Sequence, residues 1–201
     1  MPGFRRTVRA SESMSDFFHR TFDYIISSEL LPVFMRMKLM RMRGYGVKVG
    51  SCIWSHHIIK STRMSLGDKS FINVGFFFDG ADRLHIGDRV RIGQFVRVLT
   101  ATHEIGPSEQ RCTMEAVLKP VTIEDGCWIG ANVTILPGVV IRRGCVIGAG
   151  SLVTKSTEAD SLYYGNPARK VRNLNVAPAP AAVPWEQAEA FAPPRRWAEG
   201  R

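Results

Sequence analysis

No segment of this sequence has the roughly 18 consecutive apolar residues that a membrane-spanning helix needs. Residues 1–16 contain no continuous apolar run, so they do not predict a secretory signal peptide. The four cysteines have no CxxC spacing and no cluster has the spacing of metal ligands, so we expect no metal site. Together these absences predict a cytoplasmic protein with reduced thiols.

The motifs of several common enzyme and binding classes are also missing. The sequence has no glycine-rich P-loop, no HExxH and no GxSxG motif. Its formal net charge of +9 suits nucleic acid, an anionic membrane surface or an anionic small molecule. No helix-turn-helix, zinc-finger or RNP motif accompanies that charge, so we expect no nucleic-acid partner. We expect the adjacent His56 and His57 at the surface rather than in a metal site.

What the sequence does contain is a six-residue period of aliphatic residues. Its longest run is Ile123, Ile129, Ile135, Ile141, Ile147 and Val153. Earlier frames are Val47, Ile53 and Ile59, then Leu66, Ile72, Phe78 and Leu84, then Ile86, Ile92 and Val98. A helix repeats its buried positions every 3.6 residues and a strand every 2, so neither explains a period of six. The period predicts a solenoid with three flat faces per coil and one aliphatic residue per face in its centre.

Two further features of the repeat give structural expectations. Glycine follows the aliphatic residue in Ile92-Gly93 and Ile129-Gly130, and we expect it at tight corners with unusual backbone conformations. Cys127 and Cys145 are 18 residues apart, or one coil of three hexapeptides, so they should stack about 4.8 Å apart on neighbouring coils. This spacing permits a disulfide, but two reduced core cysteines are the simpler expectation.

The chain divides into three parts, residues 1–44, 45–156 and 157–201. The middle part is the solenoid, with an inserted loop at 101–120 where we expect functional residues. The last part holds a turn around Gly165, a short element after it and a tail rich in Pro and Ala.

The first part is polar at its start and helical over 16–43, with an interruption at Pro32. Residues 31–43 interleave Met and Leu with basic side chains. Such a segment fits a helix that caps the open end of the solenoid. It also fits a basic helix in peripheral contact with the inner face of the membrane. The two interpretations can hold together.

Four segments carry a resemblance to a known family: INVGFFFDG, IGDRVRIGQFVRVLTATHEIGPSEQR, CWIGANVTILPGVVIRRGCVIGAGSLVTK and YGNPARKVR. With the repeat, they resemble the hexapeptide-repeat acyltransferases, and most of all the maltose, galactoside and exopolysaccharide O-acetyltransferase group, over about residues 45–172. The resemblance implies an all-β left-handed parallel β-helix. It also implies a homotrimer with sites between subunits, and acetyl-CoA as co-substrate.

The resemblance assigns catalytic roles to two residues. His103 occupies the place of the family's general base, and imidazole suits the removal of a hydroxyl proton at neutral pH. Asn73 matches an asparagine near the reacting thioester, where its amide would donate to the oxyanion or the acceptor hydroxyl. A turn-binding asparagine is the alternative. Glu104 would orient the imidazole, or be a solvated loop carboxylate.

On the acceptor side, Asp79 would bind sugar hydroxyls, although an Asp-Gly turn explains it nearly as well. Phe71 stands where the family often has tyrosine, so the acceptor side of the site has one hydroxyl fewer than in the family. For coenzyme A, the Trp128 indole would form a wall along the pantetheine chain. The small side chains of Ala131 and Ala149 would let the pantetheine chain approach the backbone. The basic residues that would bind the coenzyme A phosphates are Lys155, Arg169, Lys170 and Arg172.

These features predict an acetyl-CoA-dependent O-acetyltransferase that acts on a sugar or polysaccharide hydroxyl. We expect direct transfer, because no Ser or Cys stands beside His103 in the motif. Two alternatives are an N-acetyltransferase of an amino sugar or xenobiotic, and a non-catalytic β-helix scaffold. The metal-binding branch of hexapeptide proteins needs several histidines per site, and here only His85 and His103 have the 18-residue spacing.

Overall fold

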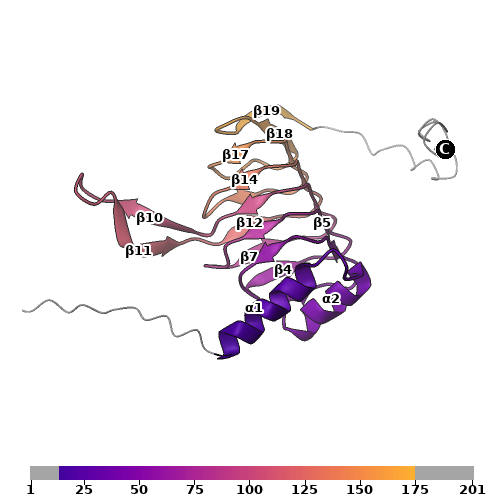
Figure 1. The fold of residues 1–201 in the computed structure, drawn as a ribbon. Helices are drawn as coiled ribbons and strands as arrows, with labels where there is room; N and C mark the ends of the chain where they lie inside the picture. Colours follow the sequence, from indigo (N-terminus) through magenta and orange to yellow (C-terminus); the bar gives the residue numbers. More distant parts are fainter. Residues whose placement is uncertain (1–13, 175–201) are drawn as a thin grey trace, which may run out of the picture.

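The computed structural model of the chain describes residues 14–174, and most of these form a parallel β-helix. Very short strands stack into three sheets, one for each face of the coil (Figure 1). The chain passes through the faces in the order A, B, C in each coil. The predicted all-β class and three-faced solenoid are confirmed.

Face A consists of β1 (Gly46–Val47), β4 (Met64–Leu66), β7 (Leu84–Ile86), β12 (Val121–Ile123) and β15 (Val140–Ile141). Face B consists of β2 (Cys52–Ile53), β5 (Phe71–Ile72), β8 (Arg91–Ile92), β13 (Trp128–Ile129), β16 (Val146–Ile147) and β18 (Ser161–Tyr164). Face C consists of β3 (Ile58–Ile59), β6 (Phe77–Phe78), β9 (Arg97–Val98), β14 (Thr134–Ile135) and β17 (Leu152–Val153).

The core is the column of aliphatic side chains that the six-residue period predicts. Every residue of the longest run, from Ile123 to Val153, is at most 1% exposed. Backbone N–H groups of one coil donate to carbonyls of the next, as from Trp128 to Cys145 and from Gly130 to Ile147, both at 2.8 Å. Each coil therefore depends on its neighbours both for hydrogen bonds and for burial of its apolar side chains.

The glycines after the aliphatic residues have a different role from the one predicted. Gly93 and Gly130 do not have the positive φ angles of the turn glycines Gly75 and Gly150. A Cβ on Gly130 would lie 2.6 Å from the backbone nitrogen of Ala149, and one on Gly93 would lie 2.7 Å from that of Ala131. Glycine is needed at these corners because the next coil passes too close for a side chain.

Cys127 and Cys145 lie side by side on neighbouring coils, as predicted, and both are buried and free. Each thiol donates to a backbone carbonyl, Cys127 to Arg142 (3.0 Å) and Cys145 to Glu158 (2.9 Å). Burial raises the pKa of Cys127 to about 12. The core position predicted for both cysteines is confirmed, and their reduced state stays a prediction.

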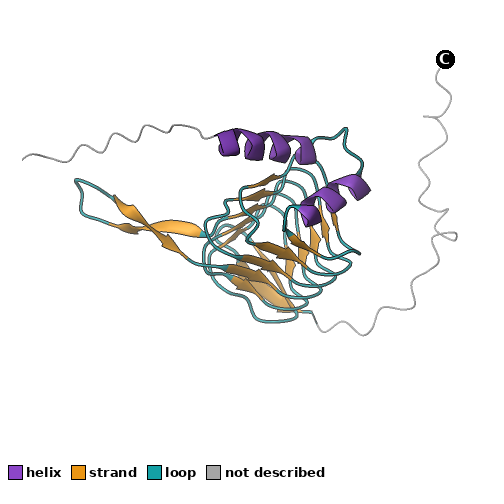
Figure 2. Ribbon diagram, turned by 90° about the horizontal axis from the view of Figure 1, so that it is seen from below, coloured by secondary structure: helices purple, strands orange, loops and turns teal. Residues whose placement is uncertain are grey.

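Two helices, α1 (Met14–Ser27) and α2 (Val33–Met42), cover the N-terminal end of the solenoid (Figures 1 and 2). Met37 and Met40 of α2 are at most 4% exposed and belong to the core. This confirms the capping interpretation. Contact with a membrane through the exposed face of α2 stays a prediction. Within residues 14–174, no helix is long and apolar enough to cross a bilayer.

Arg36 does not belong to an outward basic face, because it is only 2% exposed. Its guanidinium donates to the carbonyls of Ile26 (2.7 Å) and Ser28 (2.7 Å) at the end of α1. It also donates to Leu31 (3.0 Å) between the helices and Ile53 (3.1 Å) on β2. The charge stabilises the C-terminal carbonyls of α1 and joins both helices to the first coil.

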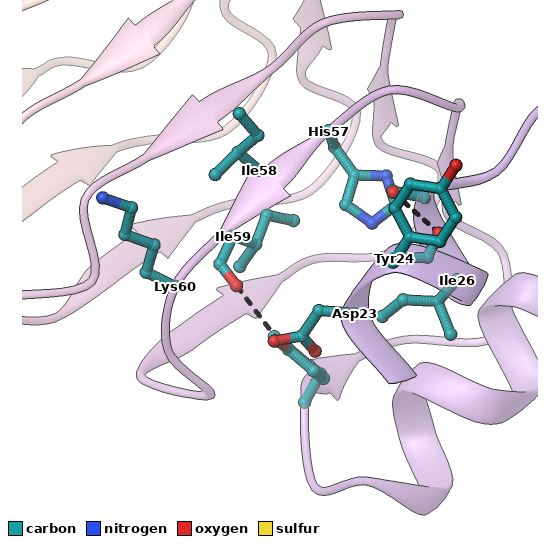
Figure 3. Close-up of a pocket in the computed structure, with 9 residues that line it drawn as sticks. Asp23, Tyr24, Ile26, His57, Ile58, Ile59 and Lys60 are labelled. Atoms are coloured by element: carbon teal, nitrogen blue, oxygen red, sulfur yellow. Dashed lines mark hydrogen bonds between the residues drawn. The ribbon is translucent and has the colours of Figure 1, made fainter. Parts of the chain in front are cut away.

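A cavity of about 250 Å³ lies between α1 and the first coil, and Figure 3 shows residues that line it. His57, one of these, was predicted at the surface together with His56. His56 is exposed, but His57 is only 5% exposed, so the prediction was wrong for His57. Its Nδ1 is 2.8 Å from the carbonyl oxygen of Trp54, and burial lowers its pKa to about 4.

The insert at 101–120 is an antiparallel hairpin rather than an irregular loop. Strands β10 (Ala101–Ile105) and β11 (Cys112–Leu118) pair with each other and project from the body, and we call this hairpin the arm (Figures 1 and 2). Each strand borders no other sheet, so almost all of its side chains are exposed.

Beyond residue 156, β18 continues face B by parallel pairing with β16. The turn around Gly165 joins it to β19 (Arg169–Asn173), which pairs antiparallel with β18. The Pro/Ala-rich tail that the sequence predicts lies outside the described residues.

We predict that Arg36→Met lowers the free energy of unfolding by about 3 kcal/mol or more, because hydrogen bonds to a buried cation are lost and carbonyls lose their donor. Chemical denaturation measures this loss. Lys38→Met, an exposed change on the same helix, is the control and should shift stability by about 0.5 kcal/mol or less. Equal effects of the two changes would contradict the role of Arg36.

We predict that His57 makes stability depend on pH. Since its folded pKa of about 4 lies below the ordinary 6.5, the unfolded chain binds a proton between these values that the folded chain does not. The free energy of unfolding should therefore fall as the pH drops from 6.5 to 4, by on the order of 3 kcal/mol. Denaturation at pH 7 and pH 4.5 should show a smaller fall for His57→Phe than for the native chain. Identical falls would refute a buried neutral imidazole.

Candidate active site

His103 lies on β10 of the arm, and its side chain is exposed. Its Nδ1 is 2.8 Å from the carbonyl oxygen of Thr113 on β11. A carbonyl oxygen can only accept, so Nδ1 carries the proton and the neutral ring has its lone pair at Nε2. No hydrogen-bond partner for Nε2 occurs in the described part of the chain. The arm therefore presents an imidazole in the tautomer that a general base needs.

Glu104 does not orient this imidazole within one copy of the chain. Successive side chains of a strand point to opposite faces. Glu104 is exposed and has no hydrogen bond or ion pair to any residue that the structure describes. The backbone of Thr113 holds the ring instead, and a role for Glu104 stays a prediction.

Asp79 directly follows β6, one coil below the place where the arm begins. Its Oδ2 accepts from the backbone N–H groups of Thr100 (2.7 Å) and Ala101 (3.2 Å). Its Oδ1 accepts from the Thr100 hydroxyl and from the backbone N–H of Ala81 (3.3 Å). The turn interpretation accounts for the bond to Ala81. The other three bonds go to the root of the arm, so few acceptor positions are left for sugar hydroxyls.

Asn73 lies at the corner between faces B and C. Its Oδ1 accepts from the backbone N–H of Val74 (2.8 Å), which is the turn-binding arrangement. This bond fixes the amide plane and leaves the Nδ2 group, which has no partner among the described residues, as a donor. The turn-binding role and the donor role are therefore compatible.

Phe71 and Trp128 point outward from face B in the same column, with Arg91 between them. The Phe71 ring makes an edge contact with Trp54 at 6.0 Å between centroids. Trp128 is 60% exposed, which leaves its indole free to form a wall against a ligand or a second chain.

Ala131 and Ala149 follow the corner glycines Gly130 and Gly148 on successive coils, as the sequence predicts. The Ala131 carbonyl accepts from Gly150 (2.8 Å). The backbone N–H groups of Ala131 and Ala149 have no hydrogen-bond partner among the described residues. They form an open pair of donors one coil apart.

Three of the four predicted phosphate-binding residues come together. Lys155, Arg169 and Lys170 line a cavity of about 250 Å³ beside the last coil. The ammonium of Lys170 already pairs with Glu158. Arg172 pairs in register with Leu162 and does not line this cavity.

The site residues thus form two groups on one chain. Asn73, Ala131 and Ala149 lie at the corner between faces B and C, whereas the arm with His103 leaves from the corner between faces C and A. The strands of face C separate these corners, and the arm extends away from the body (Figure 2). No group of three metal-ligating side chains occurs among the described residues.

Comparison with known proteins relates the chain to hexapeptide-repeat proteins. Residues 120–155 match the family model described as the hexapeptide repeat of succinyl-transferase. A putative colanic acid biosynthesis acetyltransferase of Escherichia coli is 30% identical over 143 residues, which cover 70% of this chain and 76% of that protein. The crystal structure of a hexapeptide-repeat acetyltransferase of Vibrio cholerae, complexed with acetyl-CoA, superposes with a TM-score of 0.71 and 31% identity, covering 82% of this chain and 92% of that one.

The chain belongs to the hexapeptide-repeat acetyltransferases. A putative acetyltransferase of Schizosaccharomyces pombe is 39% identical over 108 residues, or 54% of this chain and 52% of that protein. This chain spans about half the length of the first curated relatives that it matches. The coverage of the Escherichia coli relative establishes the family, and the resemblance seen in the sequence is confirmed.

Sequence reasoning missed two residues of the candidate site, Thr100 and Thr113. Thr113 acts through its backbone carbonyl, which no side-chain pattern reveals. Thr100 is fully buried and bonds to a carboxylate 21 residues earlier. The aliphatic column contained a signal for the contact between Asp79 and Thr100. Phe78 and Val98 are register partners, so Asp79 lies opposite Leu99 and next to Thr100.

Proposed function

We propose that this protein is an acetyl-CoA-dependent O-acetyltransferase whose acceptor is a hydroxyl of a sugar or a glycan. The observation that carries the proposal is the exposed imidazole of His103, held at Nδ1 by the Thr113 carbonyl with its Nε2 open. Family membership supports the acetyl donor, since related proteins are named as acetyltransferases and one has been crystallised with acetyl-CoA.

In the proposed reaction, Nε2 of His103 removes the proton of the acceptor hydroxyl as its oxygen attacks the thioester carbonyl carbon. A carbon–oxygen bond forms, and negative charge develops on the carbonyl oxygen. The Nδ2 group of Asn73 donates to this oxyanion. The carbon–sulfur bond then breaks, and coenzyme A leaves as the thiol with the proton returned from His103.

The complete site needs a second copy of the chain, because the arm and the Asn73 corner belong to different edges of the solenoid. Two apolar side chains of the arm, Ile105 and Met114, are 86% and 89% exposed. Large exposed apolar side chains on a projecting hairpin suit burial against a neighbour. We therefore propose that the arm of one subunit carries His103 to the face B–C corner of the next, in a homotrimer.

Coenzyme A would lie along this corner. In this proposal the open N–H groups of Ala131 and Ala149 donate to the pantetheine carbonyls, and the exposed Trp128 covers the pantetheine chain. The cavity lined by Lys155 and Arg169 would take the phosphates through charge-assisted hydrogen bonds.

The test of the proposed function is thiol release from acetyl-CoA with a panel of sugars, oligosaccharides and amino sugars. We expect release with one hydroxyl acceptor and its loss in His103→Ala, by about 100-fold or more. His85→Ala, an exposed histidine on face A, is the matched control and should keep full activity. Release only with amines, or unchanged release in His103→Ala, would contradict the proposal.

We also predict that Lys155→Ala and Arg169→Ala each weaken coenzyme A binding roughly tenfold, because each removes a charged hydrogen bond. Arg172→Ala, which changes a basic residue outside the cavity, should leave the Kd within about twofold. Titration calorimetry with coenzyme A measures all three. If Arg172→Ala weakened binding most, the phosphates would lie elsewhere.

A further inference from the structure

The structure shows a carboxylate that joins the arm to the body. Asp79 accepts two hydrogen bonds from backbone N–H groups at the start of the arm, at Thr100 and Ala101. It accepts a third from the Thr100 hydroxyl. These donors converge on one side chain, and an ionised carboxylate has enough acceptor positions for all of them.

The other end of the arm is tied to the same place. The carbonyl of Thr100 accepts from the backbone N–H of Lys119, where the arm returns to the body (2.9 Å). The hydroxyl of Thr100 also accepts from the backbone N–H of Asp82 (2.9 Å). Both strands of the arm therefore meet the body at Thr100, and Asp79 holds Thr100.

The hydrogen bonds from Thr100 and Ala101 to Asp79, which we call the clamp, lie close enough to His103 to control its position. His103 is three residues beyond Thr100 on β10, or about 10 Å at the rise of an extended strand. A tilt of about 10° at the root would move the imidazole by about 2 Å. Displacements of about 1 Å at a reacting group can reduce rates about 100-fold.

We propose that Asp79 is a positioning residue for the acetyl transfer: it fixes the direction in which the arm leaves the solenoid, and so the position of Nε2 of His103. Asp79 does not contact the acceptor in this mechanism. The inference rests on the proposed function for its kinetic consequence, while the clamp itself is a property of the arm. It replaces the sequence-based interpretation of Asp79 as a ligand for sugar hydroxyls.

The chain offers a matched control. Asp88 is also half-buried, and its Oδ1 accepts a backbone N–H from the neighbouring coil, that of Asp68 (2.7 Å). It lies at the corner between faces A and B and makes no contact with the arm. Asp88→Asn therefore removes a comparable carboxylate from the same solenoid without touching the root of the arm.

The experiment compares Asp79→Asn and Asp88→Asn in the full-length protein. We expect Asp79→Asn to lower kcat by about 10- to 100-fold with the KM values for acetyl-CoA and acceptor within about twofold. Asp88→Asn should leave kcat within about twofold. Thr100→Val should lower kcat in the same way, and Thr100→Ser, which keeps the hydroxyl, should restore it.

Hydrogen–deuterium exchange supplies a readout that does not need activity. In Asp79→Asn the amides of residues 100–119 should exchange faster while those of the aliphatic column stay protected. In Asp88→Asn the arm should be unchanged. If the native protein released no thiol with any acceptor, the proposed function would fail, but the exchange data would still decide whether Asp79 clamps the arm.

Three results would overturn the proposal. The first is a raised KM for the acceptor with unchanged kcat in Asp79→Asn, which would make Asp79 an acceptor ligand. The second is an equal loss of kcat in both Asp variants, which would reduce Asp79 to a general contribution to stability. The third is unchanged exchange of the arm in Asp79→Asn.

Discussion

The stacking of coils at one fixed spacing is the constraint on which the whole molecule depends. Backbone N–H groups of each coil donate to carbonyls of the next, and one aliphatic side chain per face fills the centre. An isolated coil could neither complete its backbone hydrogen bonds nor bury its aliphatic side chains, so the solenoid forms as a unit. The same spacing sets what the corners can hold. Gly93 and Gly130 carry no side chain because the neighbouring coil passes within 3 Å of where a Cβ would lie.

The rigid body and the projecting arm divide the chemistry between them. The body provides regular columns of side chains and corner amides, which suit a long, extended ligand. The arm provides an imidazole that is oriented at Nδ1 and open at Nε2. Because the two lie on different edges of the solenoid, the geometry fits the proposed site shared between copies of the chain. In that proposal, the rigidity of the root of the arm contributes to catalysis.

The fold was predictable because the repeat is local and periodic. The aliphatic column, the paired cysteines and the capping helices all follow from spacing in the sequence. The positions of His103, Asn73, Ala131 and Ala149 follow from the family resemblance. The spacing could not predict contacts made by the backbone or between distant residues. These are the hydrogen bond between the Thr113 carbonyl and His103, and the hydrogen bonds from Thr100 to the Asp79 carboxylate. The burial of Arg36 and His57 where the helices meet the first coil was also not predictable. These depend on how the helices and arm pack, which no period encodes.

The central claim is direct transfer of an acetyl group from acetyl-CoA to an acceptor hydroxyl, with His103 as the base. The most direct measurement is a two-substrate initial-velocity study with the acceptor that the thiol-release panel identifies, followed by intact mass after incubation with acetyl-CoA alone. The account predicts intersecting reciprocal plots and a protein of unchanged mass. Parallel plots, with an acetyl group on the exposed Cys112 of the arm, would contradict it.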